Sequence, residues 1–184
     1  MNKLPNHTAL KEWSTVVEAL ARGEQILLLR KGGIADATFG IEAERFCLYP
    51  TYFHQGETEP RTSVTITHWC EVVRMWRTSD RNALQRIAPL AGIPRETFEA
   101  RYRFRPDQAL HIIAVRAFAL EHAPTIAFRE SYGGCLSWIS LEEEIDITGS
   151  RPVLSEAELD VKMNTVARVL ANAGDPVVEP APVS

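Results

Sequence analysis

The sequence predicts a single α+β domain, in which a small mixed or barrel-like β-sheet lies between helices at the N- and C-terminal ends. Three observations support this fold class: a helical pattern at the start of the chain, apolar runs of strand length in the middle, and a well-capped helical pattern near the end. The 184 residues are 45% hydrophobic, which suffices for one sizeable core. We expect residues 1–174 to form one domain and the Pro/Val-rich tail 175–184 to be disordered.

The first helix is expected over residues 9–22. Thr8 is placed to cap it and Gly23 to end it. Its apolar face consists of Leu10, Trp13, Val17 and Leu20. Two strands are expected next, ILLLR (26–30) and RFCLYP (45–50), and Pro50 should end the second.

The middle of the chain combines strand and helix patterns. The segments SVTITHW (63–69) and CEVVRMW (70–76) alternate in the manner of one long strand or two. A short helix should follow, capped by Ser79 and ended by Pro89. Pro94 should open another helix, with Phe98 and Tyr102 on its buried side.

The longest strand pattern is ALHIIAVRAFAL (109–120), which is apolar on both faces except for His111 and Arg116. Such a run predicts a central strand. A glycine turn and a further strand are expected in YGGCLSWISL (132–141). The last helix should begin with the capping box of Ser155 and Glu158 and end at Gly174.

Charge is distributed unevenly along the chain, whose net charge is −4. Residues 1–130 carry 17 Lys and Arg against 15 Asp and Glu, or +2, and residues 131–184 carry 3 against 9, or −6. The first part therefore leaves room for a basic patch and an anionic ligand. No apolar run approaches the ~20 residues of a membrane span, and the N-terminus lacks the apolar region of a secretion signal. We expect a cytoplasmic protein without a membrane partner.

Cysteine usage indicates neither disulfides nor a zinc site. Cys47, Cys70 and Cys135 are odd in number and far apart, without a CxxC pair. We expect three reduced thiols in the core. His68 and Cys70 alternate on one strand face, but no third ligand is near them in the sequence.

Two predicted strands end in arginine after four apolar residues, ILLLR at Arg30 and IIAVR at Arg116. An arginine beside a core must be paired or face a cleft. One interpretation is a structural ion pair with a carboxylate such as Glu12 or Glu18. The other directs both guanidinium groups, within about 10 Å of each other, at a phosphate or carboxylate. Lys31 and the amides of the following two glycines would assist.

Polar side chains also follow the second strand, where loops on a rigid scaffold commonly carry sites. They are Thr51, Tyr52, His54 and Gln55. His54 has the chemistry of a base or a hydrogen-bonding group, and the alternative is a structural histidine in an ordered turn.

Known enzyme signatures are incomplete in this sequence. A Nudix hydrolase needs a glycine and glutamates at spacings that LEEEID (141–146) does not offer. A restriction-type nuclease needs a D/E-x-K triplet on a strand, whereas Asp160 and Lys162 lie in the capped last helix.

Several blocks resemble the bacterial and cyanobacterial family called domain of unknown function 1802 (DUF1802). They are ALKEWSTVVEAL, LLLRKGGI, LYPTYFHQ, YGGCLSWISL and SRPVLSEAE, in the family's order from Ala9 to about Leu170. The resemblance implies a cytoplasmic bacterial protein and supplies no catalytic residue.

A more distant resemblance concerns the RNA-binding domains of the ASCH type, in the PUA-like superfamily of small β-barrels. Their pattern G-x-K-x-x-E-x-R follows a helix and lies on the first strand. Gly23 and Arg30 match the glycine and the arginine, whereas Gln25 and Leu28 replace the lysine and the glutamate. The resemblance implies a PUA/ASCH-like fold without ASCH-type catalysis.

The leading hypothesis is therefore a binding module for an anionic ligand, namely a single-stranded or modified nucleic acid or a nucleotide, with no cofactor and no metal. The expected ligand-binding residues are Arg30, Lys31, Thr51, Tyr52, His54, Gln55 and Arg116. One alternative is a phosphoester-acting enzyme, a nuclease or hydrolase, that uses His54 with Arg30 and Arg116. Another is a protein-interaction module whose acidic C-terminal region docks a basic partner.

Overall fold

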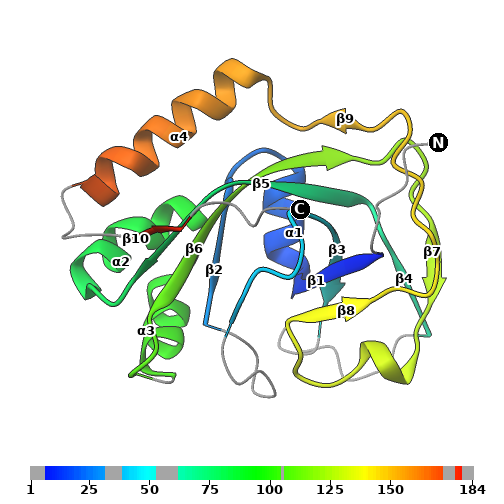
Figure 1. Cartoon of the computed structure of the whole chain (residues 1–184), viewed down its shortest axis with the longest axis horizontal. Coiled ribbons are helices and arrows are strands. Elements are labelled where there is room, and N and C mark those ends of the chain that lie inside the picture. The colour runs from blue at the N-terminus through cyan, green and yellow to red at the C-terminus, as the bar shows by residue number, and fades with distance from the viewer. Residues whose placement is uncertain (1–6, 32–38, 53–61, 105, 172–176, 180–184) are drawn as a thin grey trace.

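The structure is a computed structural model of the chain and describes residues 7–31, 39–52, 62–104, 106–171 and 177–179 (Figure 1). The strands are β1 (Thr8–Trp13), β2 (Leu27–Arg30), β3 (Arg45–Thr51), β4 (Ser63–Thr65), β5 (His68–Thr78), β6 (Leu110–Ala119), β7 (Thr125–Ala127), β8 (Trp138–Ser140), β9 (Arg151–Pro152) and β10 (Val177–Glu179). The helices are α1 (Ser14–Ala21), α2 (Arg81–Ile87), η1 (Ala88–Ala91), α3 (Arg95–Arg103), η2 (Glu130–Tyr132) and α4 (Glu156–Ala171).

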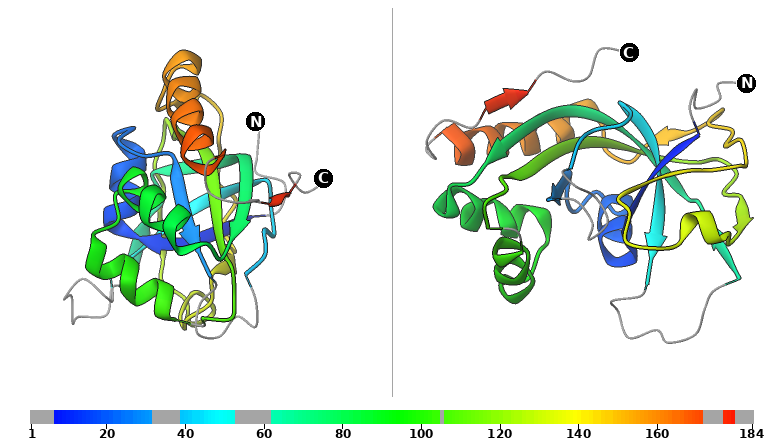
Figure 2. Two further views of the ribbon diagram at one scale, coloured as in Figure 1. Left: turned by 90° about the vertical axis from the view of Figure 1, so that its left-hand side faces the viewer. Right: turned by 60° about the horizontal axis from the view of Figure 1, so that its bottom comes forward.

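A mixed sheet forms the centre of the domain, in the order β2-β6-β5-β3-β1-β8, with β9 beside β6 and β10 beside β5. Only β1 and β3 are parallel among the described pairs. β4 and β7 form a separate two-stranded sheet. Figure 2 shows that β5 and β6 are strongly bent, so the sheet curls around its concave side. The predicted α+β class with a mixed, barrel-like sheet is confirmed.

Both faces of β2 are buried, as its apolar run predicts. Leu27 and Leu29 face α2, α3 and α4, where they pack with Leu84, Phe98 and Val166. Leu28 faces the concave side, where it joins a cluster that contains residues of α1, β3 and β6. β6 pairs with β2 and β5 and is the central strand that its sequence predicts.

The prediction of a helix over residues 9–22 is wrong for residues 9–13. Residues 8–13 form β1, which pairs with β3 on one side and with β8 on the other. Ala9 and Leu10 point to opposite faces and both are fully buried, so long-range pairing overrides the helical pattern. The helix begins at Ser14 without a side-chain cap from Thr8, and it ends before Gly23, which has φ of 66°.

Prolines and caps account for the other differences. Pro50 lies inside β3 rather than ending it. The pairing of β3 with β5 stops at Cys47, so the N–H that proline lacks would not have bonded to β5. Asp80, not Ser79, caps α2 by accepting the Asn82 amide. Pro89 lies within η1, which continues α2.

The capping box of the last helix is confirmed. Ser155 N donates to Glu158 Oε2 at 2.9 Å, and Glu158 N donates to Ser155 Oγ at 3.3 Å. Gly174 lies outside the described residues. Residues 177–179, within the expected tail, form β10, which pairs with β5. The rest of the tail lies outside the described residues, so its disorder stays a prediction. No helix in the described ranges has the length and apolarity to cross a bilayer.

Candidate functional site

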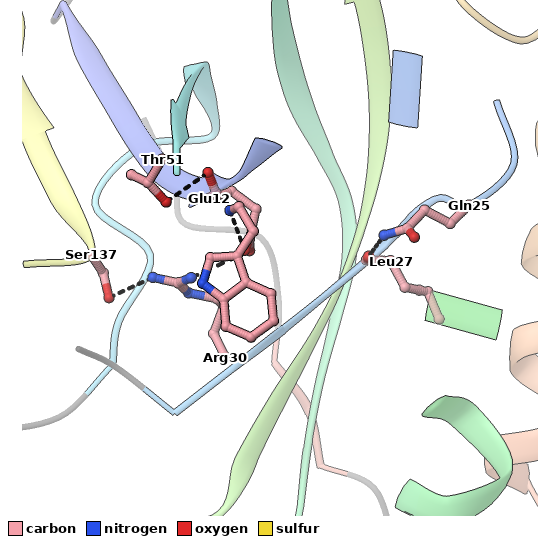
Figure 3. A network of polar contacts seen from close by, with 7 residues as sticks. Glu12, Gln25, Leu27, Arg30, Thr51 and Ser137 are labelled. Carbon is pink, nitrogen blue, oxygen red and sulfur yellow. Dashed lines mark hydrogen bonds and ion pairs between the residues drawn. The ribbon is translucent and has the colours of Figure 1, made fainter. Parts of the chain in front are cut away.

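The two cations at the end of β2 point to opposite sides of the sheet, as successive strand residues do. Arg30 points to the concave side, where its Nη1 lies 3.3 Å from Glu12 Oε2 and its Nη2 donates to Ser137 Oγ at 2.8 Å (Figure 3). Lys31 points the other way, and its Nζ donates to the carbonyls of Tyr102 and Phe104 at 3.0 and 3.1 Å.

Arg30 and Glu12 form a buried ion pair that bridges the sheet. Their side chains are 14% and 1% exposed. β2 stands first in the strand order and β1 fifth, so this contact draws distant strands together and helps to close the barrel. The Trp13 amide donates to the second Glu12 oxygen at 2.9 Å, and Thr51 Oγ1 donates to the Glu12 carbonyl at 3.1 Å. The geometry favours the structural interpretation of Arg30.

Lys31 anchors α3 to the sheet. Its side chain is buried, and burial lowers the pKa of its amino group. The carbonyls that it contacts are at the C-terminal end of α3, where a cation complements the exposed carbonyls of a helix. Lys31 is therefore placed to hold the helix rather than to meet a ligand.

Arg30 and Arg116 do not converge on one ligand, contrary to the expectation. Arg30 is opposite His111 in the pairing of β2 with β6, and Arg116 lies five residues further along β6. Side chains alternate between the two faces along a strand, so Arg116, five positions from His111, points to the opposite face of the sheet from His111 and Arg30. There its Nη1 lies 3.8 Å from Glu156 of α4, and its guanidinium lies over the Phe118 ring at 5.4 Å.

The other candidate residues have separate outcomes. Thr51 ends β3 and contacts the backbone of β1, and Tyr52 follows it, half-buried. His54 and Gln55 lie outside the described residues, so their roles stay predictions.

Two of the three cysteines are the expected core thiols. Cys47 and Cys70 are buried, and burial raises the pKa of the Cys47 thiol to about 12. Cys135 is exposed, which corrects the expectation of a third core thiol. No three metal-ligating side chains gather among the residues that the structure describes.

A cavity of about 540 Å³ lies between α1, η1 and α4. Its apolar lining consists of Val16, Ala19, Ile26, Pro89, Leu90, Val161 and Val166. Its remaining lining consists of Thr15, Arg22, Glu24, Gln25, Gly92, Lys162 and Thr165. The sequence did not reveal this cavity, because its walls come from segments about 140 residues apart.

Gln25 supplies the buried polar group of this cavity. Its side chain is 5% exposed, and its Nε2 donates to the Leu27 carbonyl at 2.9 Å (Figure 3). The described part of the chain gives it no other hydrogen bond. Its Oε1 lies against Gly92, where a Cβ would be only 2.6 Å away. One N–H and the carbonyl oxygen thus remain for a ligand.

Cations lie at the rim of the cavity. Arg22 pairs with Glu24 at 2.7 Å and with Glu18 at 3.8 Å, and all three side chains are largely exposed. Lys162 of α4 donates to the Glu24 carbonyl at 3.0 Å. The lining therefore contains two cations and one carboxylate, and Glu18 outside the lining is a second carboxylate partner of Arg22. An anion at the rim would share Arg22 with these carboxylates and would also lie near Lys162.

A concentration of arginine distinguishes one end of the molecule. Residues 74–105 contain eight arginines and three acidic residues, a local charge of +5 in a chain of net charge −4. Among the arginines of this segment whose side chains the structure describes, all are exposed: Arg74, Arg77, Arg81, Arg86 and Arg103. The sequence contains this local charge of +5, but counting charge over residues 1–130 as one segment gives only +2 and hides it.

The family model named Domain of unknown function (DUF1802) matches residues 9–165. The chain belongs to this family. The matched region covers the sheet except for β10 and the first residue of β1, together with α1, the arginine-rich end and most of α4. A comparison with curated proteins found no match.

Crystal structures of an ASCH protein from Zymomonas mobilis resemble the fold. A serine-to-alanine mutant has a TM-score of 0.52 and 10% sequence identity, over 89% of this chain and 99% of that chain. A tyrosine-to-phenylalanine mutant has a TM-score of 0.49 and 11% identity, over 86% and 96% of the two chains. The unsubstituted protein has a TM-score of 0.49 and 10% identity, over 86% and 93%. The expected ASCH-like fold of this DUF1802 protein is confirmed.

Removing one partner of the buried ion pair should strongly destabilise the protein. Arg30→Met or Glu12→Met alone should cost ~3–5 kcal/mol, because each leaves an uncompensated buried charge, and the double substitution should cost much less than the sum. Urea unfolding measures these losses. The exposed pair of Arg45 and Glu71 is the control, where single substitutions should cost ~0–1 kcal/mol. Additive losses at Glu12 and Arg30 would contradict the structural interpretation.

Removing the Lys31 amino group should loosen α3. Lys31→Met should cost ~1–3 kcal/mol and should speed amide hydrogen exchange in α3 more than in α4, because two partly buried carbonyls lose their donor. Lys162→Met is the matched control, since its amino group donates to one exposed carbonyl. Unchanged exchange in α3 would show that Lys31 is not its anchor.

Proposed function

We propose that this DUF1802 protein is a binding module for a nucleotide-like anionic ligand, held in the cavity between α1 and α4. The observation that carries the proposal is the Gln25 carboxamide, which is 95% buried beside the cavity and keeps one donor and one acceptor for a ligand. The base would enter the cavity, and the phosphate would lie at the rim near Arg22 and Lys162.

The size and the lining of the cavity suit this ligand class. Small-molecule sites are commonly about 300–1,000 Å³, mostly apolar, with a few placed polar groups. The cavity of about 540 Å³ falls within that range. Apolar side chains of α1 and α4, such as Ala19 and Val161, would cover the faces of a planar ring, while Gln25 would bind its edge.

The carboxamide also supplies a source of selectivity. Glutamine and asparagine bind nucleobase edges that present a donor next to an acceptor. A base without that pattern would leave the buried Gln25 groups unpaired, which costs ~1–3 kcal/mol. The Leu27 carbonyl fixes the orientation of the amide by accepting its other N–H.

The sequence around Gln25 favours binding over catalysis. In the ASCH-type pattern a lysine would stand at this position and a glutamate at Leu28. Gln25 is neutral, and Leu28 lies in the concave core cluster. The arginine of the pattern, Arg30, is engaged with Glu12 and Ser137. The described residues supply no observation that favours the phosphoester-hydrolysing or the protein-docking alternative.

Filling the cavity should abolish nucleotide binding. Ala19→Trp should weaken the binding of the preferred ribonucleoside monophosphate at least tenfold, because the indole would occupy the space of the base. Gln25→Met should weaken it about five- to 150-fold, the equivalent of ~1–3 kcal/mol for the lost hydrogen bonds. Isothermal titration calorimetry with the four monophosphates measures both effects.

The matched control is Ala21→Trp, on the same helix but outside the cavity lining, which should bind as the unsubstituted protein does. Thermal unfolding confirms that each variant is folded. The proposal fails if the folded protein binds none of the four nucleotides at millimolar concentration. It also fails if Ala19→Trp leaves their binding unchanged.

A further inference from the structure

Glu24 is the only acidic side chain among the residues that line the proposed nucleotide cavity. It directly precedes Gln25 in the chain, and its side chain is 57% exposed, which places the carboxylate at the mouth of the cavity. The hydrogen bond from Arg22 holds the pKa of the Glu24 carboxyl below its usual value, so the group is ionised at neutral pH. An ionised carboxylate only accepts hydrogen bonds, so a ligand group that meets Glu24 must be a donor.

The turn that carries Glu24 is held by backbone hydrogen bonds. Gly23, with φ of 66°, follows α1, and its amide donates to the Leu20 carbonyl at 3.0 Å. The Glu24 amide donates to the Ala19 carbonyl, also at 3.0 Å. This pair of bonds is typical of a helix that ends at a glycine. The Glu24 carbonyl in turn accepts from Lys162 Nζ of α4 at 3.0 Å, so the residue has a defined place between the two helices.

Arg22 orients the Glu24 carboxylate and occupies only part of it. Arg22 Nε and Nη2 donate to the two Glu24 oxygens at 2.7 and 3.0 Å, one bond to each oxygen. Such a fork fixes the plane of the carboxylate. An ionised carboxylate has about four acceptor sites, so about two remain for a ligand.

The charges around Glu24 favour an uncharged donor over a phosphate at this point. Glu18, outside the lining, lies 3.8 Å from Arg22, so the two carboxylates balance Arg22 and Lys162. A phosphate directly beside Glu24 would meet a like charge with no excess of positive charge to offset it. Lys162 gives one of its three N–H donors to the Glu24 carbonyl, so a phosphate is held better on the α4 side of the mouth.

We propose that Glu24 binds the 2′-hydroxyl of a ribose, so that the ligand of the cavity is a ribonucleotide rather than a deoxyribonucleotide. This proposal rests on the proposed function, since it takes the base to lie at Gln25. Neighbouring residues then bind neighbouring parts of the ligand, Gln25 the edge of the base and Glu24 the sugar. Carboxylates bind the ribose 2′-hydroxyl in dinucleotide-binding folds, and this hydroxyl is the group that distinguishes RNA from DNA.

Isothermal titration calorimetry with ribonucleoside 5′-monophosphates and their 2′-deoxy counterparts tests the proposal. The protein should bind its preferred ribonucleotide about tenfold more tightly than the deoxy counterpart, which lacks the donor for Glu24. The Glu24→Ala protein should bind the two with about equal affinity. Glu24→Gln keeps one acceptor oxygen without the charge, so it should keep only part of the preference.

Glu18→Ala is the matched control, because it also removes a carboxylate partner of Arg22 but lies outside the cavity lining. It should strengthen the binding of ribo- and deoxyribonucleotides alike and leave their roughly tenfold ratio unchanged, since only the local charge differs. Both glutamates are largely exposed, so neither substitution should unfold the protein, which thermal unfolding checks.

The inference is overturned if deoxyribonucleotides bind the unsubstituted protein as tightly as ribonucleotides do. It is also overturned if Glu18→Ala and Glu24→Ala change the ratio equally, since charge alone would then explain the preference. In both cases the proposed function stands, because nucleotides still bind. If neither kind of nucleotide binds the folded protein, the proposed function and this inference fail together. A preference that Glu24→Ala removes and Glu18→Ala retains supports the inference.

Discussion

The fold depends on an ion pair that joins strands far apart in the sheet. Arg30 on the first strand in the sheet order meets Glu12 on the fifth and Ser137 beside the sixth. The sheet must curl for these groups to meet, and a carboxylate that is 1% exposed is stable there only with its cation in place. The neighbouring Lys31 holds α3 outside the curl, so two successive residues fix both the closure and the helical layer.

The same closure places the candidate site. β1 leads directly into α1, and residues between α1 and β2, which include Gln25, line the cavity. α4 then crosses from the far end of the chain, with its capping box at one end and α2 beside the other (Figure 1). The cavity therefore belongs to the packing of two helices rather than to any one loop.

Local chemistry made much of the fold predictable from the sequence. The capping box of Ser155 and Glu158, the apolar run of β2 and the central strand β6 follow from interactions between near neighbours or from burial on both faces. The partnership of Arg30 with Glu12 was one of two open interpretations. Whether Arg30 and Arg116 lie on the same face of the sheet depends on the register between β2 and β6. The formation of β1 depends on its pairing with β3 and β8. A local sequence pattern determines neither of these long-range relations.

Charge asymmetry links the fold to the proposed activity. The arginine-rich segment forms one end of the molecule through α2 and α3, whereas the acidic segment 141–146 lies at the opposite end beyond β8 (Figure 1). A polyanion that approaches such a molecule is attracted to one end and repelled by the other, so long-range electrostatics would orient it before contact. The acidic segment would thus contribute to the orientation of the proposed ligand without touching it.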